Sequence, residues 1–174
     1  VAAVRIKNSA RRMSRMIEDL IDFTRTRLGT RLPTRPERVD LVEVVQQAVE
    51  ELRAAHPGRM IHVPPHPPVW GWWDPGRLAQ MASNFLGNAI QYGDSGTPVT
   101  ARIAVDGDAA TLRVHNAGAP ISPEAITHIF EPLARFSRQE TDTQGHRASI
   151  GLGLYICREI ARAHGGVIDV ESDA

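Results

Sequence analysis

The sequence predicts an α+β fold, in which a mixed sheet carries helices on one face and a long helix precedes the sheet domain. Two observations support this prediction. Residues 1–28 contain neither Pro nor Gly, and their apolar side chains recur every three or four positions, which is typical of an amphipathic helix. The later helical and strand-like segments follow one another without the βαβ alternation of a doubly wound fold.

Composition restricts the class of protein. The chain has 174 residues, 42% of them hydrophobic, and a formal net charge of zero, so we expect a globular protein without general affinity for nucleic acid. Cys157 is the only cysteine, which excludes an internal disulfide and suits a reducing compartment. The chain begins without Met and ends at "VESDA", within a predicted strand. We therefore expect a cytoplasmic fragment of a longer protein that is either soluble or membrane-anchored.

The N-terminal helix is long for so small a protein, at about 40 Å for 28 residues. Its apolar positions are Met13, Met16, Ile17, Leu20, Ile21, Phe23 and Leu28. This length favours one helix of a dimerising hairpin. The alternative, a helix packed only on its own domain, remains open.

A proline-containing stretch, 29–38, follows the helix and predicts a linker. We place the domain limits at 1–32 for the helical segment, 33–39 for the linker and 40–174 for the second domain. Asp40 stands three residues before Glu43, a capping-box pattern that predicts a helix start.

The first predicted helix of the second domain ends at Pro57-Gly58, and two short strands follow around a proline-rich turn within 60–74. A helix from Pro75 to Tyr92 comes next, and then two strands at 98–105 and 110–116, joined near "DGD". The last predicted elements are a short helix after Ser122, an irregular stretch at 131–150, a helix from 151 and a final strand at 167–172.

The helix 75–92 carries two asparagines one turn apart. By helical periodicity the polar stripe is Arg77, Asn84, Asn88 and Gln91, and the core-facing side is Leu78, Ala82, Phe85, Ala89 and Tyr92. The stripe is either a solvated face or one wall of a site. Two glycine-containing loops, "VHNAGAPIS" (114–122) and "SIGLGLYI" (149–156), favour a site. The second loop opens a helix, whose N-terminus is suited to phosphate.

These segments together resemble the catalytic part of bacterial sensor histidine kinases, of the GHKL ATPase superfamily. "NFLGNAIQY" is similar to the asparagine box N-x-x-x-N-A-x-K/R-F/Y, "NAGAPI" to the first glycine box, "FEPLAR" to the phenylalanine box and "SIGLGL" to the second glycine box. "RMSRMIEDLIDFTR" resembles the second helix of the dimerisation and phosphoacceptor hairpin. The pairing of "HNAGAPI" with "FEPLARF" is most similar to soluble kinases linked to PAS or phytochrome domains.

The resemblance implies a two-layer α/β sandwich, the GHKL or Bergerat ATP-binding fold, with ATP and Mg²⁺ as cofactors. Asn88 would ligate Mg²⁺, Asn84 would lie near the phosphates, Tyr92 would line the adenine pocket and Asn116 would bind the adenine amine. The full set of implied ATP-binding residues is Asn84, Asn88, Gln91, Tyr92, Asn116, Gly118, Ile121, Arg135, Ser149, Gly151, Leu152, Gly153 and Leu154. Residues 137–150 would form a mobile lid.

The chain departs from the family pattern at four positions. Gln91 replaces a basic residue, Asn116 replaces an aspartate, and Pro120 and Ser149 replace glycines. No histidine lies in the N-terminal helix, so the phosphoacceptor is expected upstream, and the fragment alone is not expected to autophosphorylate.

The resemblance implies a fragment of a two-component sensor histidine kinase that transfers the γ-phosphoryl of ATP to a histidine. Its partners would be a second copy, through the N-terminal helix, and a response-regulator receiver domain. Two alternatives remain open. One is a GHKL ATPase with a mechanical role, although the helix 75–92 has no carboxylate to activate water. The other is a non-catalytic dimerising or nucleotide-sensing module.

Overall fold

The computed structural model describes residues 2–133 and 151–173. The chain divides into two compact units, which we describe separately. The helical unit comprises Val1–Pro33 and Ser122–Val170, and the sheet unit comprises Thr34–Ile121 and Glu171–Ala174.

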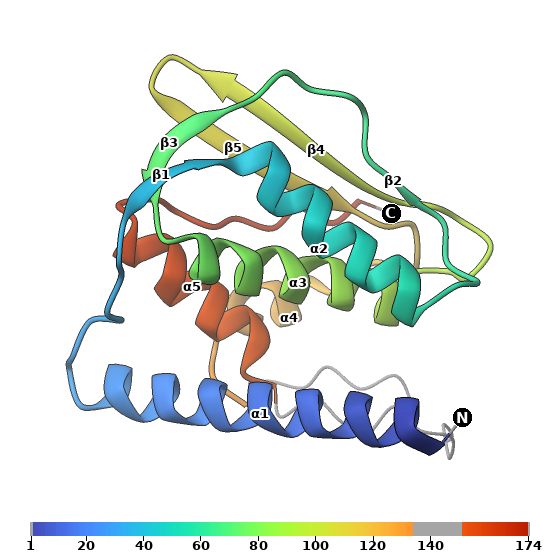
Figure 1. The fold of residues 1–174 in the computed structure, drawn as a ribbon, viewed down its shortest axis with the longest axis horizontal. Coiled ribbons are helices and arrows are strands. Elements are labelled where there is room, and N and C mark those ends of the chain that lie inside the picture. The colour runs from blue at the N-terminus through green and yellow to red at the C-terminus, as the bar shows by residue number, and fades with distance from the viewer. Residues whose placement is uncertain (1, 134–150, 174) are drawn as a thin grey trace. The chain divides into compact units, whose positions relative to one another are not determined.

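The sheet unit has a strand layer and a helix layer (Figure 1). Strand β1 (Glu37–Asp40) pairs antiparallel with β3 (Trp70–Trp73). Strand β4 (Val99–Asp106) lies between β2 (Ile61–His62), which is parallel to it, and β5 (Ala109–His115), which is antiparallel. Helices α2 (Leu41–Ala55) and α3 (Pro75–Tyr92) lie side by side on one face of the strands. The predicted mixed sheet with helices on one face is thereby confirmed.

Two aspartates fix the starts of these helices. The Asp40 Oδ1 accepts from the N–H of Val42 at 3.0 Å and from the N–H of Val69 at 2.8 Å, so one carboxylate both caps α2 and holds the segment that leads into β3. Asp74 caps α3 by accepting from the N–H of Arg77. Partial burial raises the pKa of Asp74, but hydrogen bonds from backbone N–H groups outweigh it and hold that pKa below its ordinary value.

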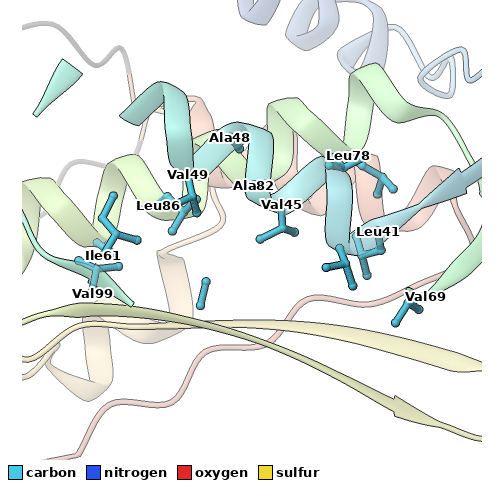
Figure 2. Close-up of a cluster of buried hydrophobic side chains, with 14 residues drawn as sticks. Leu41, Val45, Ala48, Val49, Ile61, Val69, Leu78, Ala82, Leu86 and Val99 are labelled. Carbon is cyan, nitrogen blue, oxygen red and sulfur yellow. The ribbon is translucent and has the colours of Figure 1, made fainter. Parts of the chain in front are cut away.

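The core of the sheet unit lies between α2, α3 and the strands (Figure 2). Its buried side chains on α3 are Leu78, Ala82, Leu86 and Ala89. The predicted core side was wrong at Phe85, which is half-buried, and at Tyr92, which is 56% exposed, and it omitted Leu86, which is fully buried. Leu78, Ala82 and Ala89 are buried as predicted, and Leu86 is buried in place of its neighbour Phe85 on the face that packs against α2.

The helical unit contains α1 (Ala2–Arg27), α4 (Pro123–His128) and α5 (Gly153–Ala163). The predicted N-terminal helix is confirmed. Near its C-terminal end, Phe23 packs edge-to-face on Tyr155 of α5, with ring centroids 5.7 Å apart. The Thr26 and Tyr155 hydroxyl groups are 2.8 Å apart and share a hydrogen bond.

Helix α1 also exposes apolar side chains that α5 does not cover. Met13, Ile17, Leu20 and Ile21 are each about half exposed or more, as is Leu28 directly after the helix. Helix α1 therefore packs on α5 near its C-terminal end and presents a stripe of exposed apolar side chains between Met13 and Ile21.

The segment 167–172 is not a strand, although the sequence predicted one. Its side chains make contacts in place of a backbone ladder: Glu171 pairs with Arg113 at 3.8 Å, and the Ser172 hydroxyl accepts from the Ile121 N–H at 2.9 Å. The stretch predicted as a linker also differs, since β1 begins at Glu37. Among the described residues, no helix is long and apolar enough to cross a membrane.

Candidate functional site

Helix α3 places its two asparagines at the border of the core. Asn84 and Asn88 are half-buried, whereas Ala82 and Leu86, on the neighbouring face, are fully buried. Gln91, one turn further on, is exposed. The polar stripe therefore flanks the core, as helical periodicity predicts.

The segment after β5 meets the C-terminal end of this helix. The Asp94 N–H donates to the Ala117 carbonyl at 2.8 Å. A Cβ added to Gly118 would lie 3.0 Å from the Tyr92 carbonyl oxygen, so the glycine permits this close approach. The structure thus brings together Tyr92, Asn116 and Gly118, which the sequence had supplied through two separate motifs.

Ile121 ends this glycine-containing segment and is half-buried. Its N–H donates to the Ser172 hydroxyl at 2.9 Å, which fixes the end of the loop within the sheet unit. The backbone from Asn116 to Ile121 is therefore held at both ends, a condition for a loop that must present a side chain in a defined orientation.

The second glycine box belongs to the helical unit. Gly151 has φ of +78°, a conformation that favours glycine, and its carbonyl accepts from the Leu133 N–H at 3.0 Å. Leu152 is buried and Gly153 is the first residue of α5. Leu154 is half-buried in the first turn. This helix start combines glycines with the positive end of a helix dipole, and such a combination is suited to binding phosphate.

The candidate residues divide between the two units. Asn84, Asn88, Gln91, Tyr92, Asn116, Gly118 and Ile121 belong to the sheet unit, and Gly151, Leu152, Gly153 and Leu154 to the helical unit. Arg135 and Ser149, together with the lid predicted at 137–150, lie outside the described residues.

The donor set on α3 fits a magnesium ion that is held mainly by a nucleotide. Amide oxygens are hard ligands of the kind Mg²⁺ prefers, and Mg²⁺ retains several waters and binds substrate phosphates. In the described part of the chain, no three His, Cys, Asp or Glu residues cluster in a way that would hold a metal by themselves. Asn84 and Asn88 would be the α3 residues that supply amide oxygens to a metal held mainly by phosphates.

One contact at this site was not predicted. Arg59, after α2, donates from Nη1 to the Asp94 carbonyl at 2.7 Å. Its partner is a backbone oxygen, which any residue type supplies, so no residue pattern identifies the pair in advance. The only local signal is the Pro57-Gly58 turn that precedes it.

Comparison with known proteins places these features in a family. The family model described as histidine kinase-, DNA gyrase B- and HSP90-like ATPase matches residues 73–174. This range includes α3, the segment after β5 and the start of α5.

Among curated proteins, the chain is 37% identical over 166 residues to a bacteriophytochrome of Pseudomonas aeruginosa, covering 95% of this chain and 22% of that protein. It is 34% identical over 177 residues to the sensor histidine kinase TrcS of Mycobacterium tuberculosis, covering 98% of this chain and 34% of that protein. The chain thus spans about a fifth to a third of the length of these relatives.

Solved structures share the fold. The mycobacterial sensor histidine kinase MprB aligns with a TM-score of 0.64 and 26% identity over 75% of this chain and 81% of that one. Full-length ShkA, solved in complex with AMPPNP, aligns with a TM-score of 0.69 and 27% identity over 93% of this chain and 33% of that one.

Proposed function

Because the chain belongs to the family of histidine kinase-, DNA gyrase B- and HSP90-like ATPases, we propose that it is the ATP-binding catalytic part of a two-component sensor histidine kinase. The parent protein transfers the γ-phosphoryl group of ATP to a histidine that is not among the residues of this chain. The phosphoryl group then passes to the receiver domain of a response regulator. Both ATP and such a receiver are found in the cytoplasm, where we place the chain.

The observation that carries this proposal is the meeting of the α3 C-terminus with the segment after β5. It gathers the Asn116 amide, the Gly118 backbone and the main chain of Tyr92 at one place in the sheet unit. In the proposed site Asn116 accepts from the adenine amine and Tyr92 lines the base. Asn88 ligates Mg²⁺ and Asn84 lies near the phosphates.

The remaining proposed contacts are to the phosphates. Gly151 and Gly153, with the backbone of Leu152 and Leu154, provide the helix start at which phosphate oxygens bind. We also assign Gln91, Gly118 and Ile121 of the sheet unit, together with Arg135 and Ser149, to ATP binding.

Phosphoryl transfer requires mainly positioning and charge stabilisation from the protein. Bound Mg-ATP supplies the reactive phosphoryl group and the metal charge. Helix α3 holds the nucleotide but has no Asp or Glu between Arg77 and Tyr92 that would activate a water. This composition favours transfer to a histidine over the hydrolysis expected of a mechanical ATPase.

Calorimetric titration of the chain with ATP, with and without Mg²⁺, tests the proposal. We expect saturable binding that Mg²⁺ strengthens, and negligible phosphate release in a parallel hydrolysis assay. Rapid hydrolysis would support the mechanical ATPase. Lack of binding at millimolar ATP would support the non-catalytic module.

We propose further that residues 1–32 are the second helix of a dimerisation hairpin, joined by a linker that ends before β1 to the ATP-binding domain. The exposed apolar stripe on α1 supports this assignment, because an aqueous surface disfavours a contiguous row of such side chains. The partner would be a second copy of the chain.

Ile17→Asp is expected to reduce self-association of the chain by at least about tenfold, because it places a charge in a stripe that burial would otherwise stabilise. Ile17 is 59% exposed in the single chain. Sedimentation over a concentration series measures the effect. Arg15→Asp, on the opposite side of the helix, is the matched control and should change association little. An unmodified chain that is monomeric at every concentration would contradict the prediction.

A further inference from the structure

The end of helix α3 is held by Arg59, an arginine outside every sequence motif. Its Nη1 donates to the Asp94 carbonyl at 2.7 Å and its Nη2 to the Gly93 carbonyl at 3.4 Å. A cation at the C-terminal end of a helix also interacts favourably with the helix dipole. Arg59 therefore fixes the main chain directly after Tyr92.

That stretch of main chain contacts Asn116. The Asp94 N–H donates to the Ala117 carbonyl at 2.8 Å, and the Asn116 Nδ2 donates to the same carbonyl at 3.4 Å. A Cβ added to Gly93 would lie 2.9 Å from the Asn116 Cβ, so Asn116 packs directly against this glycine. The Ala117 carbonyl thus accepts from both the turn that Arg59 holds and the Asn116 amide.

The orientation of the Asn116 amide determines which base it recognises. An amide presents an acceptor oxygen on one side and a donor NH₂ group on the other. The bond from Nδ2 to the Ala117 carbonyl turns Oδ1 away from that carbonyl. Adenine has a donor amine where guanine has an acceptor oxygen. An amide held in this orientation accepts from adenine, whereas a rotated amide donates to guanine.

We infer that Arg59 is a positioning residue for base selectivity: through Asp94 and Ala117 it holds the Asn116 amide in the orientation that accepts from adenine. The inference rests on the proposed role of Asn116 at the base and adds a residue that touches no part of the nucleotide. An aspartate has two equivalent acceptor oxygens and needs no such orientation. An asparagine does, because its two sides differ chemically.

Metal-free ADP and GDP test this inference, since they separate base recognition from the metal. We expect Arg59→Met to weaken ADP binding by about 2- to 12-fold, which corresponds to losing one neutral hydrogen bond between Asn116 and the adenine amine. The preference for ADP over GDP should fall by a similar factor. Arg59→Lys retains the charge and one donor, and should give an intermediate preference.

Arg53→Met is the matched control. Arg53 also donates to a backbone carbonyl, from Nη2 to Ile61 at 2.7 Å, but it makes no hydrogen bond to the turn after α3 or to Asn116 among those described. Its removal should leave the preference for ADP over GDP unchanged. Tryptophan fluorescence reports folding of each variant, because Trp70, Trp72 and Trp73 all lie in the sheet unit.

Introducing Arg59→Met into the Asn116→Ala variant completes a double-mutant cycle. If Arg59 acts through Asn116, then Arg59→Met should have no further effect on the preference there. An unchanged preference in Arg59→Met, or an equal effect of this change in both backgrounds, would overturn the positioning role while leaving the proposed function intact. If Arg59→Met does not fold, the preference of Arg59→Lys decides. An unmodified chain that binds no ADP would overturn the proposed function, and this inference with it.

Discussion

Asn116→Ala is expected to weaken binding of every adenine nucleotide by about 5- to 150-fold, with or without Mg²⁺, because it removes the acceptor for a buried adenine amine. Asn116 is half-buried beside Gly93 at the end of α3, and the substitution leaves the backbone contact between Asp94 and Ala117 in place. Asn116→Asp should retain or tighten binding, since a charged acceptor forms the stronger bond.

Asn88→Ala distinguishes binding of the metal from recognition of the base. If Asn88 ligates Mg²⁺, its loss should weaken Mg-ATP binding and barely change metal-free ADP. Calorimetric titration of both variants with Mg-ATP and metal-free ADP measures the difference. His115→Ala, an exposed neighbour of Asn116, is the control for Asn116→Ala and should bind normally. Equal losses in both alanine variants, regardless of Mg²⁺, would refute this division of roles.

Leu86→Ala is expected to lower the free energy of unfolding of the sheet unit by about 2–5 kcal/mol, the usual cost of a cavity left by a buried leucine. Leu86 is 0% exposed, and it lies in the layer between α2, α3 and the strands (Figure 2). It belongs to a core cluster with residues of α2 and the strands, so the site has little room to collapse around the smaller residue.

Urea unfolding followed by tryptophan fluorescence measures this change in the right unit, because all three tryptophans are at positions 70–73. Leu28→Ala is the matched control: Leu28 is 79% exposed and lies in the helical unit, so its removal should cost little. A loss below about 1 kcal/mol for Leu86→Ala would show that Leu86 is not a central core residue.

The helices were predictable because their signals are local. Asp74 and Pro75 mark the start of α3 and Gly93 its end, and the structure has the helix at Pro75–Tyr92. The asparagine stripe was equally accessible, since helical periodicity places Asn84 and Asn88 on one side.

The features that the sequence did not predict depend on contacts between distant segments. Helix α3 buries Leu86 and not its neighbour Phe85, and periodicity alone cannot decide between two adjacent positions at the edge of a face that packs on α2. Segment 167–172 has the alternation of a strand, but Glu171 and Ser172 make side-chain contacts instead. The hydrogen bonds of Arg59 could not be predicted because their acceptors are backbone carbonyl oxygens, which every residue type has.

The strength of the contact between α1 and α5 determines the fraction of molecules in which the two helices are separated. Its two directional interactions, the Thr26–Tyr155 hydrogen bond and the Phe23–Tyr155 ring pair, are worth about 1–3 kcal/mol together. On these two terms alone, the contact is open in between roughly 1 in 6 and 1 in 160 molecules at equilibrium. A ligand or partner that requires the open form would bind with an apparent affinity reduced by that same factor.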